Sequence, residues 1–142
     1  MNGDPSVPRP RLLLADSDGR RRQVTATLLR LGGYHVTEVA TLGEVPKAAA
    51  GGVDVLVSET ELADGDAVAY AKALRANAGT AALPILIVSA DGTQGPAVES
   101  ALGPATFLKM PARPSDLYAR LAEVRDRSGR AGAHTAPPAS GR

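Results

Sequence analysis

The chain has 142 residues, a length that suits one domain with its own hydrophobic core. Sixteen Lys and Arg against 15 Asp and Glu leave a net charge of +1, so no overall field draws the chain to nucleic acid or to an anionic membrane. The absence of cysteine excludes disulfides and thiolate chemistry, and the sequence contains neither an export signal nor an apolar run of membrane-spanning length. We therefore expect a cytoplasmic protein.

The first third of the chain predicts two strands, each followed by a helix. Residues 1–10 hold three prolines and predict a disordered lead-in. Arg11–Ala15 is a short apolar run typical of a buried strand, and Tyr34–Val39 alternates like a second strand. A helix is indicated between them by the spacing of Val24, Leu28 and Leu31 and by the stop signal Gly32-Gly33. Thr41–Glu44 fits a capping box, and Pro46 predicts that the helix it opens is short or distorted.

The remainder predicts three further strands and three further helices. The strands are expected at Val53–Ser58, Pro84–Ser89 and Thr106–Lys109. Helices are expected from Asp64 as N-cap to Asn77, weakly over Asp91–Leu102, and over Pro114–Arg127 with Leu117, Leu121 and Val124 facing inward. Residues 128–142 are rich in Gly, Ala, Pro and Ser and predict a disordered tail, which leaves a domain over residues 11–127.

Strands that alternate with helices predict a doubly wound α/β fold with a parallel five-stranded sheet. Ligand-binding groups of such sheets lie at the carboxyl ends of the strands. A carboxylate, Glu59, ends the third predicted strand. The other polar groups expected at that edge are Asp16, Ser17, Asp18, Ser89 and Lys109.

Four segments, in order, resemble the receiver domain of bacterial two-component response regulators, a flavodoxin-like (βα)5 fold. Leu12–Gly19 resembles the first strand with its acidic pair, and Asp54–Ala67 resembles the phosphoacceptor strand and its turn. Leu83–Ala90 resembles the fourth strand with its hydroxyl residue. Ala105–Pro111 resembles the fifth strand, with an aromatic residue, a lysine and a proline that usually follows a cis bond.

The resemblance implies a role for each matching position, and three positions depart from the pattern. Glu59 stands where the family has its phosphoacceptor aspartate, and Ser17 stands where it has the second of two Mg²⁺-binding acids. Met110 takes the place of the lysine before the proline, with Lys109 one residue early. The switch positions fall on Ser89 and Phe107, and the family's partner surface, made by helix 4, strand 5 and helix 5, falls on Val98, Phe107 and Tyr118.

These departures weaken the chemistry that the family performs. Replacing a carboxylate with a hydroxyl removes charge from a Mg²⁺ site, so binding by Asp16 and Glu59 is expected to be weak or lost. A glutamate carboxylate also reaches roughly 1.5 Å further than that of aspartate, and a misplacement of about 1 Å can cost about a hundredfold in rate. Glu59 can be read as a fixed imitation of a phosphorylated aspartate, as a relic, or as a residual phosphoacceptor.

The sequence therefore predicts a pseudo-receiver, not an enzyme, that acts through a signalling partner at the helix 4–strand 5–helix 5 face. A histidine kinase is a doubtful partner, and a homodimer remains open. The alternatives are a phosphorylatable receiver and a flavodoxin-like ligand-binding domain, although the acidic edge disfavours an anionic cofactor. Arg20–Arg22 is interpreted as a solvated helix face, and Asp16 with Asp18 and Glu59 as a crowded acidic pocket that raises at least one pKa.

Overall fold

The computed structural model describes residues 8–135, and side-chain environments over residues 8–127. Its centre is a parallel five-stranded sheet in the order β2-β1-β3-β6-β7. The strands are β1 (Arg11–Ala15), β2 (His35–Val39), β3 (Val55–Glu59), β6 (Ile85–Ser89) and β7 (Phe107–Lys109). This confirms the predicted fold class and the location of each predicted strand.

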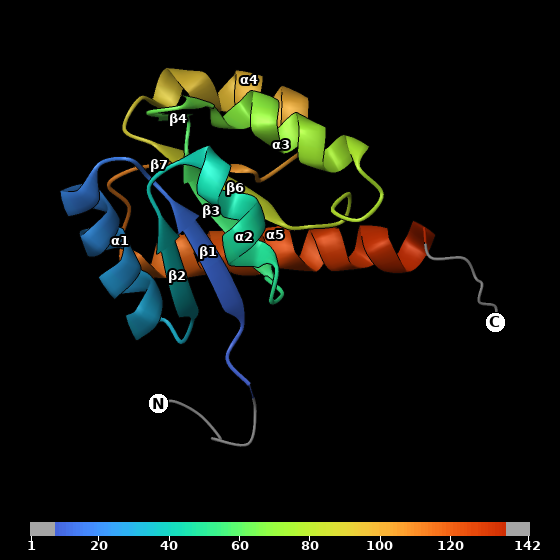
Figure 1. The fold of residues 1–142 in the computed structure, drawn as a ribbon, viewed down its shortest axis with the longest axis horizontal. Coiled ribbons are helices and arrows are strands. Elements are labelled where there is room, and N and C mark those ends of the chain that lie inside the picture. Colours follow the sequence, from blue (N-terminus) through green and yellow to red (C-terminus); the bar gives the residue numbers. More distant parts are fainter. Residues whose placement is uncertain (1–7, 136–142) are drawn as a thin grey trace.

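Helices cover both faces of the sheet (Figure 1). One face packs against α1 (Gly19–Leu31) and α5 (Pro114–Thr135), and its core includes Leu12, Leu14, Ala26, Leu29, Leu117 and Leu121. The other face packs against α2 (Val45–Ala49), α3 (Ala67–Ala76) and α4 (Gly95–Leu102), and its core includes Leu13, Leu56, Ala71, Ile85, Val98 and Phe107. Because alternate strand residues point to opposite faces, each strand supplies both cores.

The helices α2 and α4 are each preceded by a short 3-10 turn, η1 (Leu42–Glu44) and η2 (Gly92–Gln94). Pro46 lies in the first turn of α2, which has only five residues. The prediction of a short or distorted second helix is therefore confirmed. Glu44 closes its capping box by accepting the backbone N–H of Thr41 at 3.0 Å.

Two details of the helices and one of the turn before α3 differ from prediction. Val24 and Leu31 are 59% and 76% exposed, because α1 turns Ala26 and Leu29 toward the sheet. Asp66, not Asp64, caps α3, since the turn before it forms a small antiparallel hairpin, β4 (Glu61–Leu62) with β5 (Gly65–Asp66), that the sequence did not predict.

The last helix is longer than predicted. It continues past Arg127 to Thr135, so residues 128–135 of the predicted tail belong to α5. The predicted disorder of residues 1–7 and 136–142 lies outside the described residues.

Candidate functional site

The candidate site lies at the carboxyl edge of the sheet and is built around Asp16, the residue after β1. Asp16 is 3% exposed, and its backbone N–H donates to the carbonyl of Val39 at 3.1 Å. One oxygen of its carboxylate, Oδ1, accepts the backbone N–H of Asp18 at 2.9 Å. A buried carboxylate is costly unless a cation and hydrogen bonds compensate it.

Arg21, in the first turn of α1, supplies that cation. Its Nε donates to Asp16 Oδ2 at 2.7 Å and its Nη2 donates to Asp16 Oδ1 at 2.7 Å, which makes a bidentate pair. The same Nε lies 3.4 Å from Glu59 Oε2. The hydrogen bonds to Asp16 raise the pKa of the guanidinium. One guanidinium of the chain therefore contacts both pocket carboxylates. Arg21 is 48% exposed, so it lies on the predicted solvated face, but it also has a role in the pocket that the sequence did not predict.

Arg22 also contacts this edge. Its Nη1 donates to the backbone carbonyl of Asp16 at 2.8 Å, while its Nε pairs with Glu38 at 3.1 Å. Arg22 thereby ties the end of β1 to β2. Arg20 is exposed and forms no ion pair with another described residue, so it fits the predicted solvated face without a further role.

Glu59 ends β3 and is 8% exposed. Its pKa is raised, chiefly because burial desolvates the carboxylate. Arg21 opposes this rise and the charge of Asp16 adds to it. The predicted direction is therefore right, but burial rather than crowding of acids is the largest cause.

The two residues between Asp16 and α1 do not complete an acidic pocket. Asp18 is exposed and caps α1 by accepting the backbone N–H of Arg21 at 3.0 Å, which lowers the pKa of Asp18. The hydroxyl of Ser17 donates to the carbonyl of Ala40 and accepts the N–H of Ala63 at 2.7 Å. Ser17 thus links three loops where the family pattern has a second acid.

Asp64 reinforces the link between these loops. Its carboxylate accepts the backbone N–H groups of Leu42 at 2.8 Å and Gly43 at 2.9 Å. These two bonds lower the pKa of Asp64. The β4–β5 hairpin is therefore attached to the start of η1, and the loops that follow β1, β2 and β3 are joined by hydrogen bonds.

On the far side of the edge, the predicted residues make local contacts. Ser89 is buried, and its Oγ accepts the backbone N–H of Asp91 at 3.0 Å. The exposed Lys109 lays its aliphatic stem against Gly92, where an added Cβ would be 2.9 Å from its Cδ, and it forms no ion pair with a described acid. Met110 packs against the core under α1 and α5, and its bond to Pro111 is cis.

The three residues predicted for the partner surface are engaged inside the domain. Val98 and Phe107 are 2% and 7% exposed. The hydroxyl of Tyr118 donates to the carbonyl of Leu28 at 2.6 Å. As surface contacts in this conformation, Val98 and Phe107 are wrong, because apolar side chains at a helix–sheet interface are buried in the core. Tyr118 is partly exposed, and its role at a partner surface stays a prediction. The same face exposes Ala97, Ala101 and Lys109 instead.

Comparison with solved structures defines the class of fold. No family model matches the chain. A sensor protein from Polaromonas is 26% identical, with a TM-score of 0.77 over 85% of this chain and 99% of that one. A protein described as a response regulator from Chloroflexus aurantiacus is 24% identical, with a TM-score of 0.76 over 84% of this chain and 99% of that one. Chemotaxis protein CheY4 from Vibrio cholerae is 24% identical, with a TM-score of 0.72 over 82% of this chain and 99% of that one.

These neighbours include response regulator receiver domains, and the chain has their CheY-like, flavodoxin-like fold. Within residues 8–135, no helix is long and apolar enough to cross a membrane. In the same described part of the chain, no three Asp, Glu or His side chains gather in a way that could hold a metal ion. The carboxyl edge, where the resemblance implies phosphoryl chemistry, instead holds the Arg21 pair.

Proposed function

We propose that this chain is an atypical receiver domain, a pseudo-receiver of a two-component or phosphorelay system, that signals by protein contact without a phosphorylation cycle and is not an enzyme. The observation that carries the proposal is the position of Arg21. Its guanidinium is bonded to both oxygens of Asp16 and lies beside Glu59. The chain itself thus supplies the cation that faces both pocket carboxylates.

Phosphoryl transfer depends on a metal, a cation and a nucleophile that are positioned together. Mg²⁺ needs hard oxygen ligands in near-octahedral geometry. Both carboxylate oxygens of Asp16 accept hydrogen bonds from Arg21, and the Ser17 hydroxyl is hydrogen-bonded to backbone groups of two other loops. The donor set therefore does not fit Mg²⁺, and Met110 supplies no cation before Pro111.

In this proposal Glu59 is a structural carboxyl group that accepts no phosphoryl group, and the loops around it keep one arrangement. A partner would then bind the α4–β7–α5 face constitutively, because no phosphorylation step changes that face. The exposed residues Ala97, Ala101 and Lys109 are its candidate contacts. Replacing Ala101 with arginine should weaken such a complex, and the same change at Ala69 on α3 is the matched control.

The test is an NMR titration of the protein with millimolar Mg²⁺ and then beryllofluoride, which imitates a phosphoryl group. We expect the amides of Glu59, Ser89 and Phe107 to stay in place. A variant that restores the family pattern, with Ser17→Asp, Arg21→Gln, Glu59→Asp and Met110→Lys, serves as the positive control. Concerted shifts in the unmodified protein would establish the competing function, a phosphorylatable receiver.

A further inference from the structure

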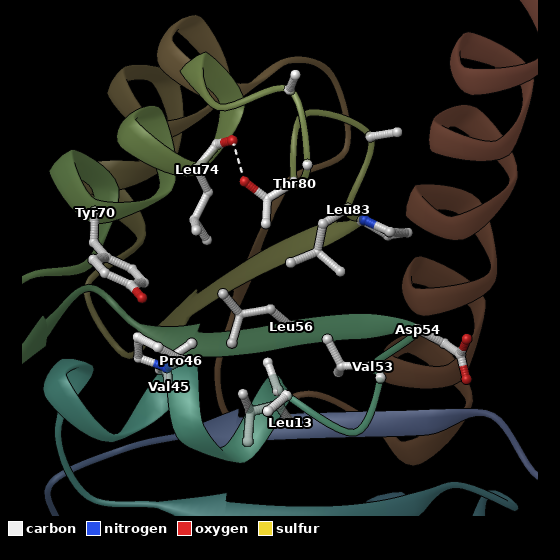
Figure 2. A pocket seen from close by; sticks show the side chains of 17 residues that line it. Leu13, Val45, Pro46, Val53, Asp54, Leu56, Tyr70, Leu74, Thr80 and Leu83 are labelled. Carbon is white, nitrogen blue, oxygen red and sulfur yellow. Dashed lines mark hydrogen bonds between the residues drawn. The ribbon is translucent and has the colours of Figure 1, made fainter. Parts of the chain in front are cut away.

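An apolar groove of about 700 Å³ lies on the sheet face between α2 and α3. Leu13 of β1 and Leu56 of β3 form its floor. Its sides come from α2 and α3 and its end from the loop before β6, as Figure 2 shows with Val45, Pro46, Tyr70, Leu74 and Leu83. The groove extends toward the amino ends of β3 and β6, away from Arg21.

The groove follows from the short second helix. Pro46 starts α2, and the chain leaves the helix after Ala49 through a turn that contains Gly51 and Gly52. Gly52 has a positive φ of 105°, a conformation that favours glycine. A helix of five residues is about 7.5 Å long by its rise per residue, so it covers only part of the space beside α3. The floor residues Leu13 and Leu56 are buried, and the apolar side chains around them, Val53, Leu74 and Leu83, stay partly exposed.

The lining of the groove carries almost no charge. Its one acidic residue, Asp54, is committed to Arg11: Oδ2 accepts the Arg11 backbone N–H at 2.7 Å and lies 3.8 Å from Nε of its guanidinium. Thr80 donates its hydroxyl to the carbonyl of Leu74 at 2.6 Å. A charged ligand would therefore enter without a counter-ion, and the site selects against it.

Tyr70 is the polar group that the groove leaves available. Figure 2 shows its hydroxyl turned toward Val45 and Pro46, inside the groove. This hydroxyl makes no hydrogen bond with another described residue. Burial raises the pKa of Tyr70, so the phenol stays neutral and can both donate and accept.

The size of the groove decides between a small molecule and a protein. Small-molecule sites commonly have about 300–1,000 Å³ and a mainly apolar lining with few polar groups. A stable protein interface needs about 800 Å² and 20–30 residues on each partner, more than the 17 residues that line this groove. We propose that the groove binds an uncharged, mainly apolar small molecule with one hydrogen-bonding group that meets the Tyr70 hydroxyl.

This site is separate from the acidic edge, and the proposal does not rest on the pseudo-receiver function. The test uses naphthol as the probe, in a methyl NMR titration of the full chain. We expect saturable shifts of the methyl groups of Leu56, Leu74 and Leu83, and no shift at Val24 or Leu31 on exposed α1. Naphthoate, which has the same rings and a negative charge, should bind at least tenfold more weakly.

Two variants and one control distinguish specific binding in the groove from nonspecific binding of an apolar probe. Ala49→Trp places an indole in the groove and should abolish the shifts, whereas Ala69→Trp, on the exposed side of α3, should leave them unchanged. Tyr70→Phe should weaken naphthol about fivefold, the worth of one neutral hydrogen bond, and leave naphthalene binding as it was. Unfolded variants are recognised by their amide spectra and replaced by Ala49→Phe.

Three results would overturn the proposal. Naphthol shifts that survive Ala49→Trp or Ala49→Phe in a folded protein would place the probe elsewhere. Equal binding of naphthol and naphthoate would remove the selection against charge. Groove methyl shifts that depend on protein concentration, without the probe, would identify a second copy of the chain as the occupant.

Discussion

The carboxyl edge of the sheet and the apolar groove differ in whether their polar side chains are hydrogen-bonded within the chain. At the edge, the side chains of Asp16, Ser17 and Ser89 are hydrogen-bonded within the chain, and Arg21 is the cation that Asp16 and Glu59 share. In the groove, apolar side chains at the sides stay partly exposed, and the Tyr70 hydroxyl has no described partner. The site implied by the fold is therefore occupied by the chain's own side chains, while a separate part of the same sheet borders an open groove.

The largest expected effect tests whether the groove is open above a packed floor. Leu56 is 3% exposed, so Leu56→Ala should lower the free energy of unfolding by about 3 kcal/mol. Leu74 is partly exposed at the side of the groove, so Leu74→Ala should lower the free energy of unfolding by only about 1 kcal/mol. Urea denaturation measures both. Equal losses would mean that the side is packed as tightly as the floor and that the groove is closed in solution.

The next effect tests the closed edge. Arg21→Gln leaves the buried carboxylate of Asp16 without its cation, and we expect a loss of about 2 kcal/mol, less than for a fully buried pair because the Arg21 side chain is 48% exposed. Arg20→Gln, one residue earlier, should change stability by less than about 0.5 kcal/mol. Adding Asp16→Asn to the Arg21 variant should recover part of the loss. An equal loss at Arg20 would show that general helix charge, not the pair, is responsible.

A smaller effect tests the loop link made by Ser17. Ser17→Ala removes an acceptor from the Ala63 N–H and a donor from the Ala40 carbonyl, and should cost about 1 kcal/mol. The amide of Ala63 should then exchange with solvent faster. Ser100→Ala, on the exposed side of α4, is the matched control. Unchanged exchange at Ala63 would argue that the three loops are held together without this hydroxyl.

The pH dependence of stability distinguishes the two acids that the edge uses differently. The pKa of Glu59 is raised, so its contribution to the free energy of unfolding is fully present below the ordinary value of 4.5. That contribution is lost as pH rises through the folded-state pKa. Asp64 behaves oppositely, because its pKa is lowered: its contribution is present above 3.8 and is lost as pH falls. Urea midpoints against pH should lose the first slope in Glu59→Gln and the second in Asp64→Asn. The reverse assignment would contradict the geometry.

The smallest effect concerns the unused hydroxyl of the groove. Because the Tyr70 hydroxyl bonds no described residue, Tyr70→Phe should change the free energy of unfolding by less than about 0.5 kcal/mol. Tyr118→Phe is the contrasting variant and should cost about 1 kcal/mol, since that hydroxyl donates to Leu28 at 2.6 Å. Thermal and urea unfolding of both variants give the comparison. A clear loss at Tyr70 would reveal an internal bond that leaves nothing for a ligand.

Much of the fold could be predicted because strand signals are local. Arg11–Ala15 and the run before Ser89 are short apolar stretches, and their order fixed the sheet and its carboxyl edge. The inward face of α1 could not be read the same way, because Ala26 is buried by the approach of the helix to the sheet and not by its hydrophobicity. The family resemblance placed Glu59 at the edge but located the partner surface on Val98 and Phe107, which the core takes up.

The contact of Arg21 with Asp16 could not be predicted from the sequence. It lies five residues after Asp16 in a run of three arginines, and only the turn into α1 brings its side chain back over the carboxylate. A basic residue in the first turn of a helix, where the dipole disfavours it, was the available signal. The groove had no signal of its own, because the sequence shows which residues are apolar and not which of them remain uncovered.

The most direct test of the account is the NMR resonance of the Arg21 side-chain Nε–H, compared with that of Arg20 in the same spectrum. The account predicts that the Arg21 proton exchanges slowly, that Asp16→Asn abolishes this protection, and that millimolar Mg²⁺ leaves the resonance unchanged. An Arg21 proton that exchanges as fast as that of Arg20, or that Mg²⁺ releases, would contradict the claim that the chain closes its own acidic edge.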